Sequence, residues 1–442
     1  MATGDTSVLS PGVLASNALT ARWVEAAGGR RGQLVVSGAA VWPLLAALAA
    51  GAEGRAREEL ERAVGMPADG ALAAMGDVLG VIDRGAGTHG AIGLWVREDV
   101  PLRTGWSTAL PAGIRGVLSR TPERDQAALD AWVRERTLGI LNRLPVQVES
   151  TTLLLLAACL AIRTTWATPF ESSGLPRSFL SGPWKHRLVA DLHASFEDLA
   201  RVTVFDTPLG PLTTFNSRGA DAVDVHLVLG AENVAAGEVL REGIVAVMGR
   251  GPRRSGGELR PGDIAPGLVV EEIRCQTPEP PYLSVETVGF EVTAEHDLLG
   301  HGDLFGLTTA SDARRGHFPG ISDWPLAVER ALQRARATFT ATGFDAAAVT
   351  SIGFLLGATQ SPPPRYTVRV IQLAFDRPFG FIAIDRSSGL VLVAGWVDEP
   401  APHPDAADYE VIREGDPGAW GVPLGGGIIQ HRDLRPDRKP DR

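Results

Sequence analysis

Apolar residues recur at intervals of three and four in several segments of the first third of the chain, the spacing that aligns them on one face of a helix. Trp42–Gly51 is apolar almost throughout, so we expect that helix to be buried on all sides. Gly51 and Gly54 then interrupt the pattern before the next helical segment. Helices are predicted for Ala15–Glu25, Trp42–Gly51, Ala56–Val64 and Ala127–Leu141.

Other segments alternate apolar and polar residues or are short and wholly apolar, and both patterns predict β-strands. The strands predicted in this way are Leu34–Val36, Ala91–Val96, Leu153–Ile162, Val223–Leu229, Tyr282–Thr293, the end of Ala327–Thr342, Tyr366–Phe375, Phe379–Ile384 and Leu390–Val397. The turn Asp385–Gly389 joins the last two. Strands and helices follow one another without a βαβ rhythm, which favours an α+β fold over a doubly wound sheet.

Three segments show neither the helical nor the strand repeat of apolar residues. Arg250–Pro261 is rich in Gly, Arg and Pro and is predicted to be a loop. Gly343–Pro364 is rich in Ala, Gly and Pro with few charges, and we expect an exposed loop there. Pro400–Arg442 is charged and rich in Pro and Gly, so a loosely ordered tail is expected. No repeat and no clear linker divides the chain, which predicts one domain over residues 1–400 and a tail over 401–442.

The composition restricts the class of protein. The chain has 442 residues, of which 44% are hydrophobic and 21% charged, as in a soluble globular protein with a large core. Its formal net charge of −10 argues against a general nucleic-acid partner and against an anionic membrane surface. Met1–Gly12 has no secretory signal pattern and Leu153–Ile162 is too short to span a bilayer, so a cytoplasmic location is expected.

The two cysteines, Cys159 and Cys275, exclude a disulfide framework, although one bridge between them stays open. Each is expected to be a small buried apolar residue.

A search for catalytic motifs finds no nucleophile elbow, zinc-protease motif, P-loop or dinucleotide-binding turn. Gly300–Gly306 has the wrong glycine spacing for such a turn. Glu271 and Glu272 are neighbours in sequence, and neighbours in a strand point to opposite faces, so they are not expected to act as an acid–base pair. We therefore expect no catalytic residues, no cofactor and no enzyme activity.

One polar cluster, His296, Asp297, His301 and Asp303, resembles a set of metal ligands. A solvated helix end or turn explains it more simply, and no metal is expected.

Several motifs occur in a fixed order along residues 15 to 400. They are Val36-Ser37, Leu44–Gly51 followed by Ala52 and Gly54, Leu129–Val133, Thr137–Ile140, Leu153–Ala158, Thr165-Trp166, Pro169-Phe170, Phe290–Leu299, Phe305–Leu307, Phe318–Ser322, Arg377–Ile382 and Gly389–Pro400. In order and spacing they resemble the serpin family of serine protease inhibitors, in the manner of a divergent bacterial member. The resemblance implies a large mixed main β-sheet, two smaller sheets, eight or nine helices and an exposed reactive-centre loop at about residues 343–364.

The resemblance also implies a hinge, the part of the loop that enters the main sheet first after cleavage. The hinge residues are Gly343, Phe344, Asp345, Ala346, Ala347, Ala348, Val349 and Thr350. An inserted strand of about fourteen residues spans roughly 45 Å, which places the cleaved bond at Leu356-Gly357-Ala358. Cleavage after Leu356 is favoured because Leu fills an apolar specificity pocket. Cleavage after Gly357 is the second alternative and cleavage after Phe354 the third.

Four features depart from the family pattern. Phe344 stands where a small hydroxyl residue is usual, Ala341 where Glu opens the hinge, and Ala158 where the central strand usually carries Asn. The segment from Gly343 to Pro378 is also longer than expected. Phe344 is expected to be among the first side chains buried, and its bulk is expected to slow insertion.

Two functions remain open. The leading hypothesis is a monomeric suicide-substrate inhibitor of a chymotrypsin- or subtilisin-like serine protease. The alternative, favoured by the hinge departures, is a non-inhibitory serpin-fold protein that binds a ligand or partner. An unrelated hydrolase is a distant third, since no nucleophile constellation is present.

Overall fold

The computed structural model describes residues 9–29, 32–144, 147–172, 177–178, 182–185, 187–344, 365–403, 405–412, 422–424 and 427–431. These residues form eight α-helices: α1 Pro11–Ala27, α2 Gly38–Gly51, α3 Gly54–Val64, α4 Ala68–Arg84, α5 Thr104–Ala109, α6 Pro122–Arg136, α7 Ala236–Val247 and α8 Gly302–Phe305. None of the helices in this part of the chain is long and apolar enough to span a membrane.

The main sheet has the strand order β3-β2-β4-β17-β18-β5, with β16 paired to β17 beside this path. Its strands are β2 Thr88–Arg97, β3 Arg115–Leu118, β4 Leu154–Ile162, β5 Thr164–Thr165, β16 Phe290–Asp297, β17 Arg330–Phe339 and β18 Gly343–Phe344. The central strands β4 and β17 are parallel, whereas β2 is antiparallel to β4 and β16 is antiparallel to β17. The sheet is therefore mixed, as expected.

A second sheet has seven strands in the order β1-β21-β20-β11-β10-β9-β12. These are β1 Leu34–Val36, β9 Val202–Thr207, β10 Gly210–Arg218, β11 Val223–Leu229, β12 Arg253–Ser255, β20 Phe379–Asp385 and β21 Val391–Val397. A third sheet has five strands in the order β13-β14-β19-β15-β8. These are β8 Asp191–Phe196, β13 Ile264–Ala265, β14 Leu268–Cys275, β15 Tyr282–Val288 and β19 Tyr366–Ala374.

Two small sheets complete the described strands. The pair β6 Arg177–Ser178 and β7 Leu188–Val189 forms one, and β22 Tyr409–Ile412, β24 Gly427–His431 and β23 Val422–Leu424 form the other. The second of these lies within the segment expected to be a loosely ordered tail, so that prediction is wrong for the described part of it. The pairing of these strands is not revealed by the Pro- and Gly-rich composition of the tail.

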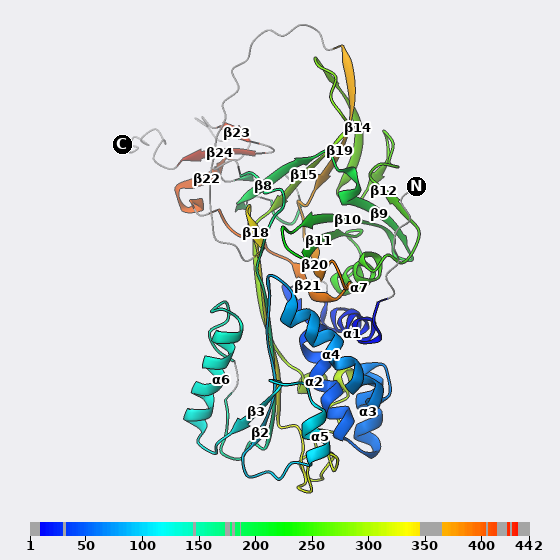
Figure 1. Cartoon of the computed structure of the whole chain (residues 1–442). Helices are drawn as coiled ribbons and strands as arrows, with labels where there is room; N and C mark the ends of the chain where they lie inside the picture. Colours follow the sequence, from blue (N-terminus) through cyan, green and yellow to red (C-terminus); the bar gives the residue numbers. More distant parts are fainter. Residues whose placement is uncertain are drawn as a thin grey trace, which may run out of the picture.

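Helices cover both faces of the main sheet (Figure 1). On one face α2 and α4 pack against β2, and α2 also contacts β4. On the other face Leu129 and Val133 of α6 join a separate apolar cluster with Leu155 and Cys159 of β4. All nine residues of β4 are buried, because the strand is covered from both sides.

The buried helix α2 begins where Ser37 caps it. The Ser37 hydroxyl accepts a hydrogen bond from the Ala40 amide at 3.2 Å, which satisfies one of the free N–H groups of the first turn. Almost every residue of α2 is buried, so its apolar composition correctly predicted its place in the core.

Helix α6 differs from the prediction for Ala127–Leu141 because it starts at Pro122 and ends at Arg136. The Thr137 hydroxyl donates to the Val133 carbonyl at 2.7 Å and accepts from the Leu141 amide at 3.1 Å. Leu138 and Gly139 follow with positive φ angles of 50° and 77°, a conformation that ends a helix. The apolar residues beyond Arg136 therefore belong to the segment that leaves α6.

Two further predictions are corrected. Tyr282–Thr293 is not one strand, because β15 and β16 belong to different sheets and meet at Gly289. The Gly289 amide donates to Ala190 and its carbonyl accepts from Ala401, so the chain crosses between sheets although its alternation continues. Arg250–Pro261 is not wholly a loop, since β12 pairs with β9 at the edge of the second sheet.

Candidate functional site

The seam between β4 and β17 lies at the centre of the main sheet. The two strands pair in parallel from Leu155 opposite Arg330 to Leu160 opposite Ala335, so no strand separates them along this length. Beyond Leu160 the strands diverge, because β4 gives way to β5 while β17 continues to Phe339. A space for another strand thus opens at one end of a closed seam.

The chain turns back into this space after β17. The Thr340 amide donates to the Gly343 carbonyl at 2.9 Å, and the Gly343 amide donates to the Thr340 hydroxyl at 3.3 Å. Three donors outside the turn also bind it. Trp166 donates from its amide to Thr342 at 3.0 Å and from its indole to Thr340 at 2.9 Å, and the Phe170 amide donates to Ala341 at 2.8 Å. The turn is therefore held by its own hydrogen bonds and by the segment that follows β5.

Strand β18 fills the opening. Phe344 pairs with Phe339 of β17 on one side and with Thr164 of β5 on the other, and both pairings are antiparallel. The Phe344 side chain is 0% exposed, and its ring centre lies 6.1 Å from that of Phe381 in β20. The first residues after the turn thus form part of the main sheet, and the Phe344 side chain lies between it and the second sheet.

These observations cover only part of the site inferred from the sequence. Gly343 and Phe344 are described and buried, so the prediction of an exposed loop from Gly343 is wrong for these two residues. The remaining hinge residues, Asp345, Ala346, Ala347, Ala348, Val349 and Thr350, lie outside the described residues, as do Phe354, Leu356, Gly357 and Ala358. Their roles stay predictions.

A buried polar contact links β17 to the start of α2. Gln333 is 0% exposed; its side-chain amide donates to the Ser37 carbonyl at 2.7 Å and accepts from the Ser37 amide at 3.1 Å. Ala158, the position where the family usually carries Asn, lies opposite Gln333 on β4. The sequence analysis missed this contact, although a Gln among the alternating alanines of β17 is the signal that could have found it.

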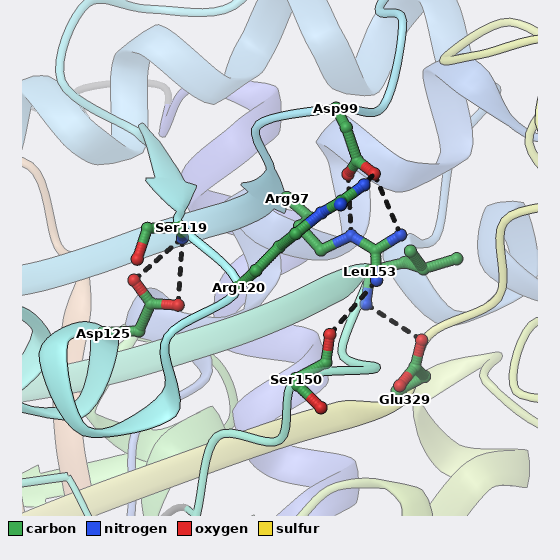
Figure 2. A network of polar contacts seen from close by, with 8 residues as sticks. All are labelled: Arg97, Asp99, Ser119, Arg120, Asp125, Ser150, Leu153 and Glu329. Atoms are coloured by element: carbon green, nitrogen blue, oxygen red, sulfur yellow. Dashed lines mark hydrogen bonds and ion pairs between the residues drawn. The ribbon is translucent and has the colours of Figure 1, made fainter.

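A polar network lies at the other end of the seam, where β4 and β17 begin (Figure 2). Arg97, the last residue of β2, donates from Nε to Asp99 at 2.7 Å and from Nη1 to the Ser150 carbonyl at 3.2 Å. Arg120 also pairs with Asp99. Hydrogen bonds from the two arginines lower the pKa of the Asp99 carboxyl to about 2.

Glu329, just before β17, belongs to the same end. Its Oε1 accepts a hydrogen bond from the Leu153 amide at 3.0 Å, and its own amide donates to Leu154 at 3.3 Å. Burial raises the pKa of the Glu329 carboxyl above its usual value, despite the Leu153 bond. These contacts connect the first residues of β4 and β17, so separating the strands over their whole length would break them.

The cysteines and the polar cluster show no catalytic arrangement. Cys159 and Cys275 are free thiols, so the bridge left open by the sequence is not formed, and burial raises the pKa of Cys159 to about 12. The His296 Nε2 atom lies 2.9 Å from the Val35 carbonyl oxygen, and Asp303 accepts from the Thr308 hydroxyl at 2.8 Å. Across the described part of the chain, no group of three or more His, Cys, Asp or Glu residues is arranged to hold a metal.

Comparisons with known sequences agree with this geometry. The model of the Serpin (serine protease inhibitor) family matches residues 17–182. Serpin-Z2A of Oryza sativa subsp. japonica is 25% identical over 425 residues, covering 83% of this chain and 91% of the relative. Both matches point to one family, and the second extends over most of the chain.

Solved structures show the same fold. Native protease nexin-1 with heparin has a TM-score of 0.64 at 16% identity, covering 88% of this chain and 98% of that one. The thyroxine-binding globulin complex with thyroxine has a TM-score of 0.65 at 17% identity, covering 88% and 99%. The fold is therefore the serpin fold. The chain is similar to serpins in sequence at low identity, which agrees with the resemblance inferred from the sequence, and the structural matches confirm the fold class. Serpins are generally protease inhibitors and not enzymes.

Proposed function

We propose that this protein is a suicide-substrate inhibitor of a serine protease, and that β18 is the first part of its inserting strand. The observation that supports this is the docking of Gly343 and Phe344 at the open end of the β4–β17 seam. A strand that continues in register from Phe344 would run down this seam. It would replace one ladder of hydrogen bonds with two, which provides the driving force for insertion.

The residues that follow suit this path. Because side chains alternate between the faces of a strand, Phe344 facing the core puts Ala346 and Ala348 on the core side of an inserted strand and Asp345 on the other. Both core-side residues are small and uncharged, which avoids the cost of burying a charge. Phe344 stands where a small hydroxyl residue is usual, but it delays insertion less than its size suggests, since this side chain is already buried before any cleavage.

The proposed reaction begins when the protease serine attacks the Leu356 carbonyl. The bond from Leu356 to Gly357 breaks, an ester forms between Leu356 and the serine oxygen, and Gly357 leaves as a protonated amine. The freed front of the loop inserts and carries the attached protease along the sheet before water can hydrolyse the ester. Inhibition therefore depends on insertion being faster than deacylation.

The test is incubation with chymotrypsin- and subtilisin-type proteases, followed by denaturing electrophoresis and mass spectrometry. We expect a covalent complex joined through Leu356 and none with a protease whose catalytic serine is replaced by alanine. Ala348→Asp should give cleaved protein without complex, whereas Ala348→Ser should still form it. Cleavage at Leu356 without any complex would refute the proposal.

The second candidate is a binding protein without inhibitory action. It is favoured by Ala341 at the hinge opening and by Ala158 in the seam, and one structural neighbour is a globulin in complex with thyroxine. Under this alternative, a single cut in the loop leaves the thermal midpoint unchanged because no strand is inserted.

A further inference from the structure

A pocket of about 290 Å³ lies between the segment that leaves α6 and the main sheet. Residues 140–143 form one wall, and the outward-facing side chains of β16 and β17 form the other. Arg334 links the walls, because its Nη1 donates to the Arg143 carbonyl at 3.2 Å. The pocket is therefore bounded by β17, one of the two strands of the seam.

Alternation along β17 supplies the charge of this pocket. Gln333, Ala335 and Ala337 face the core and are fully buried, so Arg334 and Arg336 point to the opposite face. With Arg143, three arginines line the pocket, and among its described lining residues Glu291 alone brings a carboxylate. This is a local excess of positive charge in a chain whose formal net charge is −10.

The two strand arginines keep unused donors. The Nε atoms of Arg334 and Arg336 are buried and have no hydrogen-bond partner among the described residues. Carboxylates lie near without satisfying them. Glu291 Oε1 is 3.3 Å from Arg336 Nε in an ion pair that lacks hydrogen-bond geometry, and Glu295 Oε1 is 3.6 Å from an Nη atom of Arg334. Buried N–H donors without acceptors are costly, so both side chains, which are partly exposed, would be stabilised by turning their guanidinium groups toward an acceptor in the pocket.

We propose that this pocket binds a small multivalent oxyanion of the phosphate class. Guanidinium groups match phosphate oxygens in geometry and charge, and several arginines around one concavity favour an anion with more than one negative charge. The volume lies near the lower limit for small-molecule sites, which suits an ion of pyrophosphate size. Asn142 and Thr293 also line the pocket and add neutral polar groups.

Binding at this place has a consequence for the seam, which rests on the proposed function. The cluster beneath α6 packs on Ala157 and Cys159 of β4, whereas the arginines stand on β17. Inserting one strand between β4 and β17 would move them apart by about 4.8 Å, the spacing of neighbouring strands. An anion held by both walls would then lose part of its contacts. The bound anion therefore favours the closed seam and slows insertion.

Calorimetric titration of the intact protein with pyrophosphate, at fixed low ionic strength, tests the site directly, with sulfate as a phosphate-free comparison. We expect saturable 1:1 binding that Arg336→Gln weakens at least about tenfold, as for loss of a charge-assisted hydrogen bond. Arg330→Gln is the matched control, because Arg330 lies on the same face of β17 but pairs with Glu149 outside the pocket. It should change the affinity less than twofold.

Glu291→Gln provides a test that does not remove an arginine. Loss of this lining carboxylate should tighten pyrophosphate binding severalfold. Absence of saturable binding overturns the proposal, as does an equal loss of affinity in Arg330→Gln and Arg336→Gln. Binding that Glu291→Gln weakens overturns it as well.

The consequence for insertion is measured with a protease that forms the covalent complex. Pyrophosphate should slow complex formation by the unchanged protein and have no effect on Arg336→Gln. Binding without any complex would refute the proposed function and leave the anion site supported. Complex formation without binding would refute only the anion site, and binding without a change in rate would refute its link to the seam.

Discussion

Replacing Phe344 with alanine tests whether the hinge is docked before cleavage. The side chain is 0% exposed and lies between the main and second sheets, against Phe381. Truncating a fully buried Phe costs about 3–5 kcal/mol where the surroundings stay in place. Strand β18 has only two residues, however, and each of its hydrogen bonds contributes a net ~0.5–1.5 kcal/mol. The variant can therefore release β18 instead of keeping the full cavity.

We expect Phe344→Ala to lower the free energy of unfolding by about 2–4 kcal/mol, between the cost of release and that of a rigid cavity. Urea unfolding measures this loss. Native-state hydrogen exchange shows its place, because the Trp166 and Thr340 amides are bonded to the turn and should exchange faster once β18 is free.

The matched control is Phe305→Ala, since Phe305 is also fully buried but packs against Trp23 in another part of the core. It should lower stability to a similar extent while leaving exchange at Trp166 unchanged relative to other amides. If Phe344→Ala changed the stability by less than about 0.5 kcal/mol and left this exchange unaltered, the docked hinge would be refuted.

Three further predictions concern the seam. Gln333→Leu removes the acceptor of the buried Ser37 amide and one of the donors to the Ser37 carbonyl. We expect a loss of about 1–3 kcal/mol in urea unfolding, and a loss below about 0.5 kcal/mol would contradict the role of this contact. Burial raises the Glu329 pKa, so the unchanged protein loses stability as pH rises through that folded pKa. The stability of Glu329→Gln relative to the unchanged protein should therefore increase as pH rises above the ordinary pKa of a Glu carboxyl, and a relative stability that falls over this range would be inconsistent with this sign. Asp99 has a pKa lowered to about 2, so its stabilising effect is present above the unfolded pKa and disappears as pH falls through about 2. The decrease in melting temperature caused by Asp99→Asn should therefore be largest near pH 7 and smaller in acid. A decrease that does not change with pH would exclude this cause.

Helices and strands whose faces are each either buried or exposed can be predicted directly from the pattern of apolar and polar residues. The uninterrupted apolar run of β4 predicts a strand covered on both sides, and α6 and α2 do cover it. The alternation of Val223–Leu229 predicts β11 with the same limits as the structure has. The turn Asp385–Gly389 predicts the hairpin of β20 and β21, because a local turn and two periodic segments are sufficient for that structure.

The pattern of residues predicted only part of the candidate site. Motif order located the hinge near Gly343, but composition alone assigned this residue and Phe344 to an exposed loop. Their burial results from pairing with β17 and β5, and the partner Thr164 is far away in sequence. Gln333 and Ser37 are likewise 296 positions apart, so no local period shows that they form hydrogen bonds with each other.

The sequence by itself therefore determined the resemblance to the serpin family, the fold class and those elements whose hydrophobic period marks a buried face. That information is local, because each side chain is selected for the side of its own helix or strand that meets the core. Only the tertiary structure decided what lies against each face. It brought β18, which follows β17, in beside β5, separated β15 from β16 at Gly289, and enclosed Arg334 and Arg336 under the segment that leaves α6. Pairings of this kind join distant residues whose contact depends on how the sheets and helices pack together.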